Sequence, residues 1–572
     1  MRLHLFCVAA LWALGAWAEL SPEAQLCLTH LRAGERARLE KALGPVEKLP
    51  LYRAQLSVDP TRREVKGRVF ITYVAKDRRL EALLLRLTPN AAHEGAVQLA
   101  EATAQGRPAM LELVEPTLYR VELQPSVEPG AAAQVELSLT AQVPKAPAGS
   151  DQVSLSLHGQ GGDYGAFAAS PEMMSLVGLL PAVPPSGPDG DPLAGPSGTG
   201  DLGLFEPSSW LVTVTVPTGY QVLASGNALG EVPEKGRKVR FTYGAAAARD
   251  FPIFVAKGLS HAAAKVDDVT VESYFLDTEA SAGKKALRHA AEALGQMQKR
   301  FGPYPWTHLR VVQTRLGGGA GGMEFPGLVT VSGALYRGTA DPFAAMGMPG
   351  LGAMLGGAMM QELFPNMRQL FEVTVEFTVA HEVAHQYFPM LVGSDPVGSP
   401  VTDEALAQYA ALLHIEWKHG AKAAESLRKQ YLVGTYHLHR MMGGEDGAAD
   451  RPTAEFSSTT EYAALVYGKA PLFFHQARGV LGEEAFLRGL RLYVDENRYG
   501  WVDSEAVVRS LSRQGSGAKL EALRRRWWEE ARGDEDLGKP DLAGMFGGGN
   551  LPKLDPRSMK LLEEMLRQLG GE

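Results

Sequence analysis

The chain has 572 residues, which is too long for a single compact core, so we expect two or three domains. Its composition, with 45% hydrophobic and 21% charged residues, is typical of a globular protein. The net charge of -8 gives no support to a nucleic-acid partner, which would require a basic surface, and it does not indicate a substrate preference.

The N-terminal segment, residues 1–18, has the layout of a secretory signal peptide. Arg2 supplies a positive start, residues 3–14 are a compact apolar stretch, and Ala16 and Ala18 are small residues at the two positions that a signal peptidase recognises. The stretch is too short to span a bilayer. We therefore expect cleavage after Ala18 and an exported protein, in a bacterial periplasm or the external medium. The alternative is a buried N-terminal helix.

Two further features concern the compartment. No later stretch has eighteen uninterrupted apolar residues, so we expect no transmembrane anchor. Cys7 lies within the segment to be removed and leaves Cys27 as the single cysteine, so no intramolecular disulfide is expected. Export without disulfides is compatible with a periplasm or an outside medium.

The pattern of apolar and polar residues changes several times along the chain, and these changes predict an α+β multidomain protein. Alternating apolar and polar residues predict strands from about residue 51, and longer helical periodicity dominates the second half. The expected parts are a helical segment at 19–44, a β-rich domain at 45–262, a mostly helical domain at 263–535, and a Gly-rich linker with a short helix at 536–572.

Residues 181–203 form a run dense in proline and glycine within the β-rich part. Such a run buries little apolar surface, so we expect an exposed loop. Calcium binding by Asp189, Asp191 and Asp201 is an alternative, although the loop lacks the ligand spacing of a known calcium site.

The most informative segment is the uninterrupted helical run at residues 371–388. On one helix, His381 and His385 lie one turn apart on the same face and can direct two imidazoles at one ion. Neutral imidazole suits zinc, and a catalytic zinc takes three protein ligands and keeps one open position. Glu382, next to His381, is placed to act as the general base for the attacking water.

The third ligand must come from another element, and Glu404 is the candidate. Eighteen residues separate it from His385, and Ser399-Pro400 offers a helix start just before it. Asp403 is a candidate hydrogen-bond partner for a ligand histidine. We expect one zinc ion per chain. A lone HExxH match also occurs on ordinary amphipathic helices, and the correctly spaced acid is what makes the zinc site the better hypothesis.

An HExxH motif followed after eighteen residues by glutamate resembles the M1 aminopeptidases, the gluzincin family. The resemblance implies a thermolysin-like, mostly helical zinc catalytic domain behind a β-rich N-terminal domain. It covers most of residues 45–535. The large C-terminal helical domain of many members is not expected here, because a short tail follows residue 535, and the active site would be more open than usual.

A second segment, "GGMEFPG", resembles the glycine-rich edge strand of bacterial members of this family. By that match Glu324 binds the free α-amine of the substrate, and Gly321, Gly322 and Met323 line the edge along which the substrate backbone lies. The residue types agree, because glycine permits close approach and a carboxylate pairs with an ammonium group.

A third segment, "EYAALVYGKAP", resembles the family's tyrosine element. By that match Tyr467 donates a hydrogen bond to the transition state, and Tyr462 corresponds to a second tyrosine of some members. For both residues the alternative is a packed core tyrosine. The chain departs from the family pattern at Val401, Ala405 and Ala470, where other members have Trp or Gly. The resemblance therefore does not define the shape of the substrate pocket.

Residues 341–366 form an insert rich in methionine and glycine between the edge strand and the metal helix. An adaptable flap near the cleft is one interpretation, and a lid over the substrate is another. Copper binding is the third, and it would use Met346, Met348, Met354, Met359 and Met360.

The expected activity is the removal of N-terminal residues from peptides with a free N-terminus, with zinc as the cofactor. Two alternatives stay open: a zinc endopeptidase with an open site, and a catalytically silent binding module with the same fold. The sequence does not define the preferred side chain, the physiological substrate or the oligomeric state.

Overall fold

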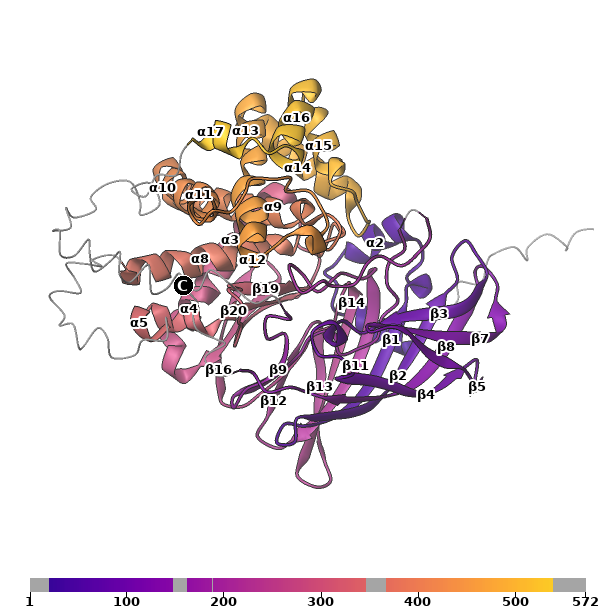
Figure 1. The fold of residues 1–572 in the computed structure, drawn as a ribbon. Helices are drawn as coiled ribbons and strands as arrows, with labels where there is room; N and C mark the ends of the chain where they lie inside the picture. The colour runs from indigo at the N-terminus through magenta and orange to yellow at the C-terminus, as the bar shows by residue number, and fades with distance from the viewer. Residues whose placement is uncertain (1–19, 148–161, 188, 346–366, 539–572) are drawn as a thin grey trace, which may run out of the picture.

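The computed structural model describes residues 20–147, 162–187, 189–345 and 367–538 (Figure 1). The predicted signal peptide, most of the Met- and Gly-rich insert and the predicted C-terminal helix therefore lie outside the described residues. Within the described ranges, no helix is long and apolar enough to cross a membrane.

The N-terminal segment forms the two short helices expected there, α1 (Pro22–Leu28) and α2 (Glu35–Leu43). Ser21 begins α1, and its side chain accepts a hydrogen bond from the amide of Ala24. The thiol of Cys27 is buried and faces the carbonyl oxygen of Trp210 at 3.2 Å, and burial raises the thiol pKa to about 12. Cys27 is therefore a packing residue of this segment.

The β-rich region contains three sheets, and its long strands β1, β8 and β11 alternate buried and more exposed positions as the sequence predicts. The eight-stranded sheet has the spatial order β13 (Asn227–Glu234), β14 (Lys238–Ala248), β11 (Ser208–Pro217), β1 (Leu51–Asp59), β2 (Glu64–Val74), β8 (Ala132–Gln142), β4 (Val97–Ala104) and β5 (Arg107–Pro108). The four-stranded sheet has the order β12 (Gln221–Ala224), β15 (Ile253–Ala256), β10 (Met173–Leu176) and β9 (Phe167–Ala169). The three-stranded sheet has the order β3 (Leu80–Arg86), β7 (Leu118–Val127) and β6 (Leu111–Glu115). One apolar core lies between these sheets.

A fourth sheet supports the helical region. Its order is β16 (Leu259–Val266), β17 (Val269–Leu276), β18 (His308–Thr314), β20 (Leu328–Ser332) and β19 (Gly322–Phe325). The expected domain division at residue 262 falls inside β16, which pairs with β17 from end to end. We therefore propose that the division lies ahead of β16, near Gly258. Strand β19 is the edge of this sheet and contacts the helix α8 (Met367–His385).

Helices make up most of the remaining chain and gather at the end opposite the β-rich region (Figure 1). They are α3 (Ala280–Phe301), α4 (Gly333–Gly338), α5 (Pro342–Ala345), α8 (Met367–His385), α9 (Glu404–His419), α10 (Ala421–Leu427), α11 (Gly434–Met441), α12 (Thr459–Tyr462), α13 (Leu472–Leu481), α14 (Glu483–Asn497), α15 (Glu505–Ser512), α16 (Gly517–Arg524) and α17 (Gly533–Leu537). The expected fold class, a β-rich domain followed by a mostly helical one, is confirmed.

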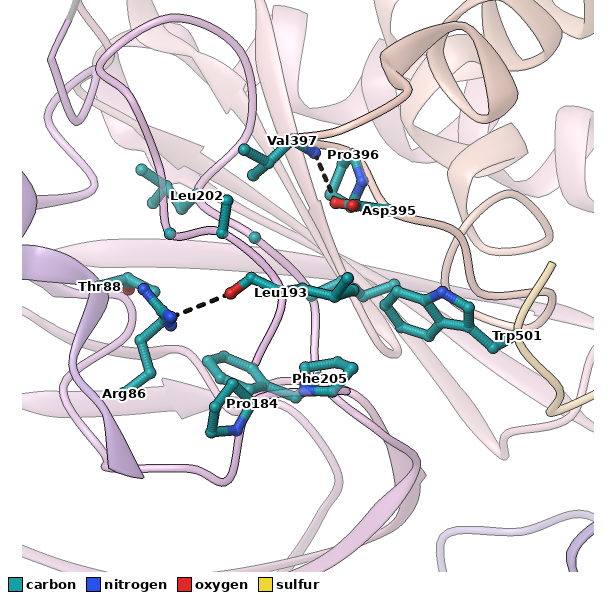
Figure 2. A pocket seen from close by; sticks show the side chains of 15 residues that line it. Arg86, Thr88, Pro184, Leu193, Leu202, Phe205, Asp395, Pro396, Val397 and Trp501 are labelled. Carbon is teal, nitrogen blue, oxygen red and sulfur yellow. Dashed lines mark hydrogen bonds between the residues drawn. The ribbon is translucent and has the colours of Figure 1, made fainter. Parts of the chain in front are cut away.

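The Pro/Gly-rich loop is exposed or half-buried in its middle, as its composition predicts, but residues near both of its ends are buried. Ala182 and Pro184 are buried at its start, and Gly200 is buried near its end. Figure 2 shows it between the two regions, where Arg86 Nη2 donates to the carbonyl oxygen of Leu193 at 3.0 Å. A loop can be buried when its polar backbone groups find partners, and here the neighbouring elements supply them.

Arg249, which follows β14, joins the β-rich and helical regions. It is fully buried, and its guanidinium donates to four backbone carbonyls, those of Phe205, Met390, Tyr499 and Gly500. The Nε to Met390 oxygen distance is 3.1 Å. Burial lowers the pKa of this arginine to about 9. One side chain thus satisfies backbone groups from three separate stretches of chain.

Candidate active site

The central feature is a cluster of two histidines and one glutamate at the ends of α8 and α9. His381 and His385 lie one turn apart on α8, and their Nε2 atoms are 2.9 Å apart. Glu404 is the first residue of α9, and its Oε2 lies 3.2 Å from each of these nitrogens. All three side chains are buried. The spacing in the sequence predicted that these residues would meet, and the structure brings them together.

The chain between the two helices fixes the position of Glu404. A short 3-10 turn, η4 (Pro400–Thr402), precedes α9, and Asp403 caps the helix by accepting a hydrogen bond from the Glu404 amide at 2.8 Å. The helix therefore starts at Glu404 and not at the predicted Ser399-Pro400.

Asp403 does not make the contact that the sequence predicts. Its carboxylate receives the Glu404 amide and the Ser394 hydroxyl, the latter at 3.4 Å, and no recorded bond reaches a histidine. The Nδ1 of His385 instead donates to the carbonyl oxygen of Phe388 at 2.6 Å. That bond fixes the ring and leaves Nε2 as the free donor to an ion.

The three side chains fit a zinc ion. Ligand atoms 2.0–2.1 Å from a tetrahedral ion lie about 3.3 Å from one another, and the separations here are 2.9 Å and 3.2 Å. The Oε2 of Glu404 is buried and accepts no hydrogen bond. Burial alone would raise the Glu404 pKa, but the neighbouring His385 and His381 outweigh it, and the pKa falls well below its usual range. The glutamate is thus an anionic ligand.

Glu382 lies between this cluster and the edge strand. It is 4% exposed, and its Oε2 has no hydrogen-bond partner. Burial, together with the charge of Glu324, raises its pKa well above the usual range. A Cβ atom on Gly322 would lie 2.4 Å from Oε1 of Glu382, so a side chain at that position would displace the carboxylate. The absence of a side chain at Gly322 therefore leaves space for the Glu382 carboxylate between β19 and α8.

The edge strand brings the predicted substrate-binding residues into the same cavity. Gly321, Gly322, Met323 and Glu324 all line it. Burial and the charge of Glu404 raise the pKa of Glu324 to about 7, although His385 opposes this shift. Glu324 thus faces the cluster closely enough for their charges to interact.

Tyr467 lies on a π-helical turn, η7 (Ala463–Lys469), on the other side of the cluster. Its hydroxyl donates a hydrogen bond to Oε1 of Glu404, and its ring centroid is 5.9 Å from that of His381. Tyr462 is buried nearby, and its hydroxyl has no hydrogen-bond partner. Both tyrosines line the cavity, so neither is a plain core residue.

The cavity measures about 340 Å³ and draws its walls from both regions of the molecule. The β-rich region contributes Tyr164, Gly200 and Asp201, and the amide of Gly200 donates to the Tyr164 hydroxyl at 3.0 Å. Sequence reasoning missed Tyr164 and considered Asp201 only as a calcium ligand, because composition does not predict where either side chain lies in the folded protein.

A second group of histidines and acids lies outside the cleft and holds α3, α8 and α9 together. Its members are His289, Glu292, Glu376, His414, Lys418 and His419. The ammonium group of Lys418 lies 2.7 Å from Glu376 and 2.5 Å from Glu292. A protein cation thus already neutralises these acids, and His414 and His419 are satisfied partners of Glu376, at 3.3 Å and 3.0 Å.

This fold and this cluster resemble those of HExxH-type metallopeptidases. Residues 339–527 match the peptidase family M1 domain. The chain therefore carries a domain of that family, as the sequence motifs predict.

Known proteins support the same assignment. The aminopeptidase N of Lactococcus lactis subsp. lactis is 26% identical over 167 residues, a match that spans 27% of this chain and 18% of that protein. An M1 zinc metallopeptidase from Deinococcus radiodurans is 18% identical with a TM-score of 0.55, and the match covers 84% of this chain and 94% of that one. A mutant of that enzyme, described as bound to a Tyr-Ser-Ala substrate, is 18% identical with a TM-score of 0.54, covering 85% and 94%. The structural matches establish the shared fold.

Proposed function

We propose that the protein is a zinc aminopeptidase that removes N-terminal residues from peptides with a free N-terminus. One zinc ion per chain would be held by His381, His385 and Glu404. The observation that carries the proposal is that the carboxylate of Glu324 shares the cavity with this cluster. Such a carboxylate is the natural partner of a substrate's α-ammonium group.

Glu382 acts as the general base in this proposal. Bound zinc supplies Lewis-acid chemistry that activates water and polarises the scissile carbonyl. Glu382 takes the proton of the attacking water and returns it to the departing amine. Burial and the charge of Glu324 raise the pKa of Glu382, which favours its acceptance of a proton.

Tyr467 stabilises the developing oxyanion by donating its hydroxyl hydrogen. The hydroxyl contacts Glu404 in this structure, so it is already beside the cluster and can turn to a substrate oxygen. The free edge of β19 offers backbone groups to an extended peptide, as edge strands do.

The β-rich region argues for an exopeptidase over an endopeptidase. Gly200 and Asp201 line the same cavity as Glu324, and beyond Glu324 the cleft continues as a side pocket of about 30 Å³, which is too small for a further N-terminal residue. A catalytically silent binding module is the remaining alternative. Turnover of a peptide by the zinc-loaded protein would exclude it.

The test combines a blocked substrate with a variant. Acetylating the peptide N-terminus removes the ammonium group, and Glu324→Ala removes its partner. Each change alone should lower kcat/KM by about 30-fold or more, since an ion pair with one partner removed costs roughly 2–5 kcal/mol. Together they should cost little more than either alone, because both break one contact. Internal cleavage of blocked peptides at the rate of free ones would refute the exopeptidase assignment.

We also propose that the protein is exported. Residues 1–18 should be absent from the exported form, which would begin at Glu19. N-terminal sequencing of the exported protein measures this, and retention of those residues would contradict it.

A further inference from the structure

A narrow side pocket opens from the catalytic cleft at the joint between the two regions. It shares Asp201, Met323 and Glu324 with the cleft, and it continues between Phe325 on β19 and Met390 beyond α8. None of the candidate zinc ligands lines it, nor does Glu382. The side pocket therefore lies beyond the proposed amine anchor, away from the bond that is cut.

The side pocket has apolar walls and acidic ends. Val177, Leu202, Phe325 and Met390 supply apolar surface. Its volume of about 30 Å³ accommodates one or two water-sized groups. This space suits the end of one unbranched side chain and excludes a large ring.

Three carboxylates face this space, from Asp201, Asp250 and Glu324, and the residues that line it include no lysine, arginine or histidine. The Oδ2 of Asp201 is buried without a hydrogen-bond partner. Asp250 receives the Phe251 amide at 2.6 Å. Burial raises the pKa of Asp250 to about 6, and burial and the charge of Glu324 raise that of Asp201. No cationic side chain among the lining residues is therefore available to pair with these acids.

The neighbouring Arg249 does not supply that cation. Its guanidinium is directed at the backbone carbonyls of Phe205, Met390, Tyr499 and Gly500. A buried carboxylate without a counter-ion is unfavourable, and a bound cation would relieve the repulsion among the three acids.

We propose that this side pocket binds the ammonium end of a lysine side chain at the first position of the peptide, which makes the enzyme selective for N-terminal lysine. The inference rests on the proposed aminopeptidase function. The methylene groups would pack on the apolar walls, and the ammonium group would pair with Asp201 and Asp250. Arginine should be accepted less well, because its planar guanidinium is larger than the space.

The kinetic test compares lysyl and norleucyl amides, since norleucine keeps the straight chain and lacks the charge. Wild-type kcat/KM should favour lysine by about 10-fold or more, the usual range for a charge-assisted hydrogen bond. Asp201→Asn and Asp250→Asn should each reduce that ratio at least about 5-fold, through the lysyl substrate. Asp191→Asn is the matched control, because Asp191 belongs to the same loop and is exposed.

A binding measurement does not depend on turnover. Calorimetry on zinc-loaded Glu382→Gln protein should show L-lysine binding more tightly than L-norleucine, and Asp201→Asn should abolish the difference. Equal affinity for the two amino acids would overturn the inference. It would also be overturned if Asp201→Asn weakened the binding of L-lysine and of L-norleucine by the same factor.

The two proposals can fail separately. If both amides are cleaved with no lysine preference, the side-pocket inference is wrong and the aminopeptidase proposal stands. If neither amide is cleaved but lysine binds selectively through Asp201, the aminopeptidase proposal is wrong and the cation pocket stands.

Discussion

Glu382 and Glu404 are both buried carboxylates, yet their surroundings give them opposite properties. His385 and His381 hold the pKa of Glu404 down, whereas burial and Glu324 raise that of Glu382. One is thus suited to bind a cation and the other to carry a proton.

Substitutions should separate these two roles. Glu382→Gln should keep one zinc per chain and lower turnover by about 10²–10⁴-fold, the range for a general base. Glu404→Ala should lose the metal, since it removes one of three ligands. Elemental analysis and kinetics on the same preparations provide the measurement. An active Glu382→Gln enzyme would show that the proton is carried by another group.

Tyr467→Phe isolates the hydroxyl group. We expect kcat to fall by about 10²-fold while KM changes little, because the hydroxyl acts mainly in the transition state. Tyr462→Phe is the control, as its hydroxyl lies in the same cavity without a partner. An unchanged kcat in Tyr467→Phe would assign that tyrosine to packing.

Asp250 should make stability depend on pH. Its folded pKa of about 6 is above the ordinary value, so the folded protein holds a proton that the unfolded chain has already released. The resulting destabilisation is present above pH 6 and disappears below about pH 4. Asp250→Asn should therefore raise Tm at pH 7.5 and leave it unchanged at pH 4. Identical Tm values for the wild type and Asp250→Asn at pH 7.5 would contradict this.

At the scale of elements, Glu376 ties α8 to α3 and α9. It is 7% exposed and contacts His289 on α3 and, on α9, His414, Lys418 and His419. Burial would raise its pKa, but these partners lower it well below its usual range, so it is a charged structural acid. The helix that carries both candidate zinc histidines is thus fixed one turn before the site.

Glu376→Gln should destabilise the protein by roughly 1–3 kcal/mol, because it removes the buried carboxylate that His414, His419 and Lys418 share. Glu372→Gln on the same helix is the control: Glu372 pairs with Lys285 at 2.5 Å nearer the surface, and such pairs contribute about 0–1 kcal/mol. Chemical denaturation of the zinc-loaded proteins gives both values. Similar losses in the free energy of unfolding for the two variants would show that the Glu376 cluster contributes no more stability than a surface ion pair.

The sequence predicts the site better than it predicts the contacts around it. His381 and His385 meet because helix geometry fixes a four-residue spacing, and Glu404 follows because a short connection returns the chain to the same place. The contacts of Asp403 were predicted wrongly, since the choice between a histidine and a helix cap depends on atomic positions. The buried ends of the Pro/Gly-rich loop were also missed, because composition describes local preference and not tertiary position.

At the scale of the whole molecule, the cleft depends on how the β-rich region docks. Arg249 joins the regions through four carbonyls, so removing it leaves several buried acceptors unsatisfied. Arg249→Met should lower Tm and expose the joint to limited proteolysis, with a cost of about 3–5 kcal/mol. Arg240→Met is the control, because Arg240 is 45% exposed on β14. Equal Tm values for the two variants would show that Arg249 does not stabilise the contact between the two regions.

The central claim is that bound zinc drives stepwise removal of residues from a free N-terminus. Mass spectrometry of a peptide incubated with the zinc-loaded protein tests it most directly. We predict products shortened one residue at a time from the N-terminus, with cleavage stopped by a chelator and restored by added zinc. Internal fragments, or cleavage that persists in the chelator, would contradict the account.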